Sequence, residues 1–193
     1  MKPTIAFFAF FLLLAGTANA QEDKRFGVEF NGGLSVATQT LDDTRLNPGF
    51  GFEGLLHYRI LPHAGVYAGW GWNRFGASES FAGPDVCFEE TGYVFGLQFK
   101  HPLGDTRMRY ALRAGGLYNH IETENAAGDI LDDTGHGLGW QVAGGLELPL
   151  GENWCLLPGL KFNSLSRESG YEGIERELNH RYVSLRLGIS TRF

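Results

Sequence analysis

Two histidines and two serines carry the side chains that could support nucleophilic chemistry in this chain. His120 and His136 flank the polar segment 121–135, and Ser164 and Ser166 lie at the end of a later apolar segment. A histidine that accepts the proton of a serine hydroxyl would create the nucleophile of a hydrolase. The sequence lacks the His-x-Ser spacing expected of a deacylase, and no residues are evident that would form an oxyanion hole. We therefore expect no catalytic residue among these histidines and serines.

The same histidines would need carboxylates to complete a metal site. Zinc takes imidazole, thiolate and carboxylate ligands, and a structural site usually has four of them. Glu122 and Asp133 lie in the segment between the two histidines and are the carboxylates that would have to help. Two histidines alone do not make a site, and we expect the protein to hold no metal and no cofactor.

A set of charged and amide side chains recurs within otherwise apolar segments. Its members are Glu29, Glu53, Gln98, Arg113, Gln141, Glu147, Lys161, Arg186 and Arg192. Charges in an apolar environment must pair, because an isolated buried charge is strongly destabilising. Such a set forms either a static network of ion pairs or a charged passage for small solutes. The choice depends on the elements that hold these residues.

The last twelve residues, 182–193, show most clearly what those elements are. The residues Val183, Leu185, Leu187, Ile189 and Phe193 alternate with Ser184, Arg186, Gly188, Ser190 and Arg192. Successive side chains of a strand point to opposite faces, so the segment predicts a strand with one apolar face and one polar, cationic face. This strand ends on an aromatic residue.

Eight segments show the same alternation with a period of two. They are residues 26–37, 48–59, 64–74, 91–101, 108–120, 136–149, 154–165 and 180–193. The connectors after the second, fourth and sixth segments are short, whereas those at 38–47, 75–90, 121–135 and 166–179 are long and polar. Short turns on one rim and long loops on the other are typical of a membrane β-barrel, and a Greek-key sandwich would not sort its connectors in this way.

The two faces of the segments separate as cleanly as the connectors. Phe95, Leu97 and Phe99 share one face of the segment 91–101, and Gln98 and Lys100 share the other. A soluble ligand-carrying barrel is apolar inside and polar outside, so charged residues in mid-strand would line its cavity. The reverse arrangement places lipid outside and ion pairs inside. We therefore predict an all-β fold, an eight-stranded antiparallel up-and-down transmembrane β-barrel.

The first twenty residues predict a signal peptide. Lys2 supplies a positive charge, residues 5–14 form an apolar run too short to span a membrane, and the sequence Ala18-Asn19-Ala20 has the form of a cleavage site. We therefore assign residues 1–20 to the signal peptide and residues 21–193 to one barrel domain. That domain has 15 basic and 22 acidic residues, a formal net charge of about −7.

On these features the chain resembles the small eight-stranded outer-membrane β-barrels, the group of the OmpA transmembrane domain, OmpX and the wider porin family. The resemblance covers residues 26–193 and rests on the strand pattern and the terminal strand. It implies short periplasmic turns, long extracellular loops and location in the outer membrane of a Gram-negative bacterium. In such barrels a terminal phenylalanine, here Phe193, is part of the insertion signal.

The resemblance also implies partners. We expect the barrel-insertion machinery and periplasmic chaperones during biogenesis, and outer-membrane lipid and lipopolysaccharide around the finished barrel, which we expect to be a monomer. The acidic balance and the lack of a Lys/Arg cluster in the sequence argue against nucleic acid.

Acidic residues concentrate in and beside the long connectors. They are Asp42, Asp43, Glu79, Asp85, Glu89, Glu90, Glu122, Glu124, Asp129, Asp132, Asp133, Glu168, Glu172, Glu175 and Glu177, which is 15 of the 22. The basic residues there are Arg45, Arg74, Arg167 and Arg176. A solvated acidic rim is the simpler interpretation, and binding of divalent cations or of a basic ligand is the alternative.

Eight strands leave an interior just wide enough for side chains to fill it, which favours a static polar core over a pore. The hairpin around 121–135 places Arg113 level with Ala143, from where we expect it to reach Gln141 or Glu147. Cys87 and Cys155 belong to opposite rims, about 25 Å apart across a membrane, and a disulfide needs Cα atoms within about 7 Å, so we expect them not to pair.

The sequence thus predicts a non-enzymatic outer-membrane barrel with a structural or surface-interaction role through long acidic extracellular loops, its lumen filled by polar and charged side chains. A small-solute channel gated by the lumen charges is the alternative. A lipid A-modifying enzyme that depends on His120 or His136 is a more distant one.

Overall fold

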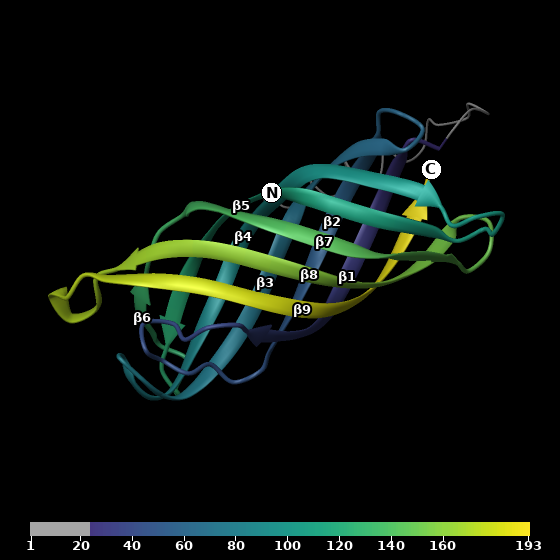
Figure 1. Ribbon diagram of the computed structural model, residues 1–193. Helices are drawn as coiled ribbons and strands as arrows, with labels where there is room; N and C mark the ends of the chain where they lie inside the picture. Colours follow the sequence, from purple (N-terminus) through teal and green to yellow (C-terminus); the bar gives the residue numbers. More distant parts are fainter. Residues whose placement is uncertain (1–23) are drawn as a thin grey trace, which may run out of the picture.

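The structure, a computed structural model, describes residues 24–193 (Figure 1). Its elements are β1 (Phe26–Ala37), β2 (Gly49–Arg59), β3 (Ala64–Ser80), β4 (Gly83–Pro102), β5 (Arg109–Glu124), β6 (Ile130–Asp133), β7 (Gly137–Pro149), β8 (Trp154–Ser169), the 3-10 turn η1 (Tyr171–Gly173) and β9 (Arg176–Arg192). The predicted signal peptide at 1–20 lies outside the described residues. Among those residues no helix is long and apolar enough to cross a membrane.

Eight of the strands form a closed antiparallel ring. The order around it is β1, β2, β3, β4, β5, β7, β8, β9, and β9 pairs back onto β1. The closing pair runs from Gly27↔Arg192 to Ala37↔Tyr182. At its end the amide of Phe26 donates to the carbonyl of Phe193 at 3.3 Å, and the amide of Phe193 donates to the carbonyl of Phe26 at 3.0 Å. The predicted fold is confirmed, with β6 as an additional short strand outside the ring that pairs with β5 alone.

The two faces of the ring carry the predicted side chains. On the outer face Leu97 is 67% exposed and Leu138 is 72% exposed, whereas Glu53 and Lys161 on the inner face are buried. Adjacent outward aromatic rings also contact one another, as with Phe52 and Trp72 at a centroid distance of 5.4 Å. Because a strand alternates its side chains, the sequence pattern determines directly which atoms meet the surroundings and which meet the lumen.

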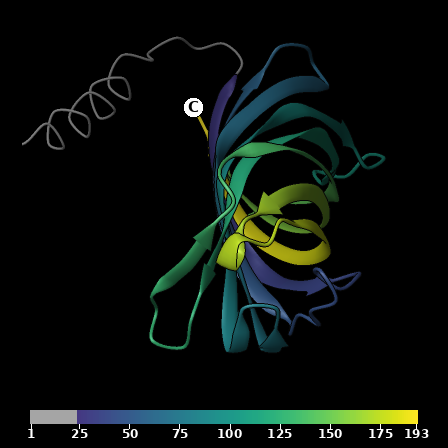
Figure 2. The same cartoon turned by 90° about the vertical axis from the view of Figure 1, so that its left-hand side faces the viewer.

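The strands are longer at the long-loop end than the sequence pattern predicted. Strands β3 and β4 continue through most of the segment 75–90, which the sequence pattern predicts to be a loop, and are joined there by a tight turn at residues 81–82. Figure 1 shows these strands extending well beyond the middle of the ring, and Figure 2 shows the hairpin of β5 and β6 leaning away from it.

The reason for this error is a change in which face is apolar. Up to Trp72 the outward positions of β3 are apolar, but the next outward residue is the exposed Arg74, and the inward residue that follows it is the fully buried Phe75. Beyond this level the outer face meets water and the inner face fills with apolar groups. The alternation continues, but the apolar residues now lie on the inner face. A strand predicted from a single apolar face is therefore too short.

We predict that the two faces of β9 respond differently to substitution. Leu187 is 58% exposed on the outer face near the middle of the strand, and Ser190 is 1% exposed on the inner face. Because the outer face is expected to lie in hydrocarbon, Leu187→Arg should lower the free energy of unfolding by about 2–4 kcal/mol. Ser190→Ala should change it little. Urea unfolding of the barrel refolded into lipid vesicles, followed by tryptophan fluorescence, measures both, and equal losses would contradict the assignment of the faces.

Candidate functional site

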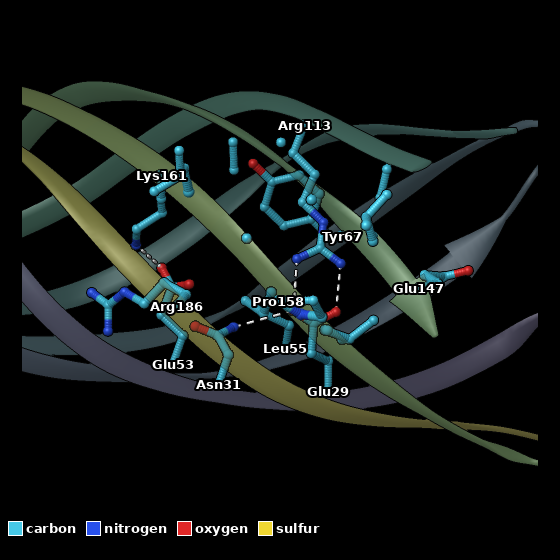
Figure 3. A pocket seen from close by; sticks show the side chains of 18 of the residues that line it. Glu29, Asn31, Glu53, Leu55, Tyr67, Arg113, Glu147, Pro158, Lys161 and Arg186 are labelled. Carbon is cyan, nitrogen blue, oxygen red and sulfur yellow. Dashed lines mark hydrogen bonds and ion pairs between the residues drawn. The ribbon is translucent and has the colours of Figure 1, made fainter. Parts of the chain in front are cut away.

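The centre of the lumen holds a two-point ion pair that spans the ring. The guanidinium of Arg113 on β5 donates to both carboxylate oxygens of Glu29 on β1, at 2.7 and 2.5 Å. Figure 3 shows the two side chains reaching toward one another. The predicted register of Arg113 beside Ala143 is correct, but the predicted partners Gln141 and Glu147 are wrong. The side chain is long enough to cross the narrow lumen, where Glu29 offers two oxygens to its planar fork.

A second ion pair lies beside the first. Lys161 on β8 donates to the carboxylate of Glu53 on β2, and each side chain is 5% exposed. Arg186 on β9 donates to the side-chain oxygen of Asn73 on β3, and in Figure 3 it lies next to Glu53. Each of these contacts joins strands that are distant in the sequence, so together they brace the ring from inside.

The two predicted amides also make lumen contacts. Gln98 accepts a weak hydrogen bond from Arg113 at 3.4 Å, and Gln141 donates to the hydroxyl of Tyr67 at 2.9 Å. The ring of Tyr67 lies 5.3 Å from the guanidinium carbon of Arg113. Gly115 makes room for this ring, because a Cβ there would lie 2.5 Å from the tyrosine hydroxyl. Tyr67 is not among the nine residues predicted for the polar lumen, although it is buried on the inner face.

The remaining predicted members, Glu147 and Arg192, meet at the short-turn end. Glu147 accepts from Lys100 at 2.5 Å and from Arg192 at 3.3 Å, and Arg109 approaches it to 3.9 Å. All nine residues predicted for the polar lumen therefore point inward, in two groups at successive depths. A cavity of about 70 Å³ lies among the central group, which is room for a few water molecules at most.

Another polar network, which the sequence interpretation missed, lies nearer the long loops. Tyr182 donates its hydroxyl to Glu90 at 2.7 Å, and Arg167 donates to the backbone carbonyl of Asn119 at 2.8 Å. The sequence pattern predicts that Glu90 and Arg167 lie in solvated loops, yet both are 4% exposed. Their strands extend further than predicted, and their positions keep the inward parity. That parity was the signal that could have identified them.

Above this network the lumen is closed by apolar side chains. The apolar plug consists of Leu41, Phe75, Ala77, Val86, Phe88, Ile121 and Leu178, each at most 2% exposed. His180 packs its ring against Phe75 at a centroid distance of 4.7 Å, and burial lowers the pKa of this histidine to about 3. His180 therefore stays neutral at physiological pH, as its apolar surroundings require. The plug blocks the lumen where the ring rises above its lipid-facing band.

The two histidines considered for catalysis lie on the outer surface at the long-loop end. His120 and His136 stack at 4.4 Å, and Nδ1 of His120 lies 2.8 Å from Asp133 and 3.9 Å from Glu122. Burial acts to raise the pKa of Asp133, but hydrogen bonds from His120 and from the amide of Gly135 outweigh it and lower that pKa.

One ligand atom each from His120, Glu122 and Asp133 lies within 4.8 Å of the others, so these three residues could hold a metal ion. Ser166, the serine considered as a nucleophile, donates instead to Glu177 at 2.8 Å. Cys87 and Cys155 are both free.

A closed ring with an apolar outer face, a polar interior and sorted connectors defines a small outer-membrane β-barrel. The chain belongs to the outer membrane protein beta-barrel domain family, whose model matches residues 6–193. The short turns are therefore periplasmic, the long loops are extracellular, and the protein resides in the outer membrane. No curated protein matches the chain by sequence.

Solved structures of small barrels share this fold. Neisserial surface protein A matches with a TM-score of 0.67 and 16% identity, over 87% of this chain and 97% of that one. Outer membrane protein W of E. coli matches with a TM-score of 0.54 and 14% identity, over 90% and 100%. Ail of Yersinia pestis matches with a TM-score of 0.52 and 15% identity, over 88% and 99%. At sequence identities this low, the similarity shows a shared fold alone.

We predict that removing one partner of the central ion pair destabilises the barrel more than removing both charges. Arg113→Met leaves Glu29 buried without its partner and should lower the free energy of unfolding by about 3–5 kcal/mol. The double variant Arg113→Met with Glu29→Gln removes the unpaired charge and should recover more than half of that loss. Urea unfolding in lipid vesicles, together with the shift in gel mobility between unboiled and boiled samples, measures both. Equal instability of the two variants would show that the charge pair itself is not responsible.

Proposed function

We propose that the protein is a non-enzymatic, non-conducting outer-membrane barrel that acts through its extracellular surface. The observation that carries the proposal is the apolar plug above the ion pairs. A conducting path would have to pass the buried rings of Phe75 and Phe88 and then the pairs formed by Arg113 and Lys161. Hydrophobic constrictions hinder ion passage because they exclude water.

The extracellular surface is well suited to contact with cationic partners. Two of its arginines pair with acidic neighbours: Arg74 contacts Glu89 at 2.8 Å, and Arg176 contacts Asp42 at 2.9 Å. The remaining carboxylates leave the rim strongly negative. Divalent cations would allow such a rim to bridge to the phosphates of lipopolysaccharide, and a basic protein surface would meet it directly. Ail has been solved with a polyanionic heparin analogue, but an acidic rim does not favour that class of ligand.

A channel gated by lumen charges is the second candidate. The cavity of about 70 Å³ beside Glu29 and Glu53 supports it, because polar walls there could accept a solute. It would require the plug to move. An enzyme has less support. Ser166 donates its hydroxyl to Glu177, and His120 contacts two carboxylates and the ring of His136.

We predict that the native barrel gives no steady conductance in planar lipid bilayers. The double variant Phe75→Ala with Phe88→Ala removes two rings from the plug and should give brief openings, because water can then enter the constriction. Leu138→Ala, on the lipid-facing side of the ring, is the matched control and should stay silent. Steady current through the native protein that changes in Glu53→Gln would favour the channel.

We predict that the exposed carboxylates of the acidic rim are needed for binding to lipopolysaccharide, which amide substitutions of similar size can test. The variant with Glu79→Gln, Asp85→Asn, Glu172→Gln and Glu175→Gln changes four exposed extracellular positions. It should lose most of the magnesium-dependent binding to purified lipopolysaccharide, measured by co-sedimentation of protein in nanodiscs. Asp105→Asn with Glu152→Gln, in the periplasmic turns, should leave that binding unchanged. Undiminished binding by the rim variant would count against a role for these charges.

A further inference from the structure

Strand pairing supplies the carboxylates that a metal site needs beside His120. His120 and Glu122 lie two residues apart on the outer face of β5, and their neighbours Ile121 and Thr123 are buried on the inner face. Asp133 on β6 pairs directly with Glu122, so its side chain shares that outer face. One imidazole nitrogen and two carboxylate oxygens thus meet at the hairpin of β5 and β6, which leans away from the ring in Figure 2. These are ligand types that zinc takes in proteins.

The distances suit one shared ion. Nδ1 of His120 lies 2.8 Å from Oδ1 of Asp133 and 3.9 Å from Oε1 of Glu122. One ligand atom of each residue lies within 4.8 Å of the other two. Zinc–ligand bonds of about 2.0–2.2 Å at tetrahedral angles place neighbouring ligand atoms about 3.3 Å apart. Small side-chain rotations therefore bring all three atoms onto one ion, and water can take the fourth position.

Two of the three side chains are already held in place by neighbours. The ring of His136 stacks on that of His120 at a centroid distance of 4.4 Å and an interplanar angle of 17°. The amide of Gly135 donates to Oδ1 of Asp133 at 2.9 Å. Neighbouring groups that orient the ligands strengthen metal binding, because less side-chain motion has to be lost when the ion binds.

Repulsion between facing carboxylates also favours a cation at this place. Glu122 is directly opposite Glu89 on one side and Asp133 on the other. Like charges directly opposite one another in a sheet are destabilising. On the first side Arg74 contacts Glu89 at 2.8 Å, whereas on the second side the neighbouring base is His120. A divalent ion between Glu122 and Asp133 offsets the repulsion that a neutral imidazole leaves in place.

We propose that His120, Glu122 and Asp133 bind a divalent transition-metal ion, zinc in preference to magnesium, and that this ion ties β6 to the ring. β6 is a strand of four residues that pairs with β5 alone. The ion adds a second link between these strands, from ligands on both. The proposal does not depend on the binding of lipopolysaccharide, because the four carboxylates that test the acidic rim are other residues.

The test is isothermal titration of the untagged mature protein, refolded in metal-free detergent, with zinc chloride. One zinc ion per barrel is expected. His120→Asn and Asp133→Asn should each weaken this binding at least tenfold, because each removes one ligand. Magnesium chloride should bind at least tenfold more weakly than zinc, because magnesium prefers oxygen ligands and gains little from an imidazole. Tighter binding of magnesium than of zinc would overturn the proposal.

The matched control is Glu168→Gln with Glu177→Gln. These two carboxylates also face one another at the extracellular end, on β8 and β9, with the hydroxyl of Ser166 in place of an imidazole. The control should bind zinc as the native protein does, and equal loss in the control and in Asp133→Asn would overturn the proposal. The shift in gel mobility between unboiled and boiled samples confirms that each variant is folded.

Another histidine pair provides a second check. His63 and His101 stack at 4.7 Å at the periplasmic end. Zinc binding that is unchanged in His120→Asn would assign the ion to a different site, such as this pair, and would overturn the proposal.

Amide hydrogen exchange tests the link between β6 and the ring. With zinc bound, exchange in β6 should slow at least tenfold in the native protein, whereas exchange in η1 should not change. Zinc that binds without slowing exchange in β6 would overturn the claim that the ion ties this strand to the ring.

Discussion

Within hydrocarbon every backbone amide and carbonyl must find its hydrogen-bond partner inside the protein, and the pairing of β1 with β9 meets that requirement. An open sheet of the same eight strands would leave two rows of unpaired groups in lipid. Closure also determines which side chains meet lipid and which meet the lumen, since each strand must then present one face outward and the other inward. The apolar outer face and the charged inner face both follow from this one constraint.

The narrow interior turns the inward charges into internal braces. Eight strands leave no wide channel, so Arg113 reaches Glu29 on the opposite wall and Lys161 reaches Glu53. Desolvation makes each of these charges unfavourable alone, and mutual contact offsets it. Gly115 leaves the space that the hydroxyl of Tyr67 occupies, and Gly71 leaves the space that the side chain of Glu53 occupies. The ion pairs thus depend on small residues elsewhere on the wall.

Charge is distributed unequally along the axis of the barrel. The extracellular rim is acidic, the central lumen holds two ion pairs with Arg186 beside them, and the periplasmic opening is lined by basic side chains. The apolar plug separates the two ends. Each end therefore presents its own surface to its own compartment.

The sequence alone determined the strands, their faces and the location of the protein, because an alternation of period two specifies which residues meet lipid. The bounds of β1 and the short turns could be predicted for that reason, as could the inward position of Glu29 and Arg113. Tertiary structure decided which inward residues meet, since partners across the ring are distant in the chain and no local pattern relates them. It also decided how far β3 and β4 extend, and that Phe75 closes the lumen. Above the lipid the apolar face of each strand is the inner one. Only the folded ring shows where the lipid-facing band ends and the apolar face changes sides.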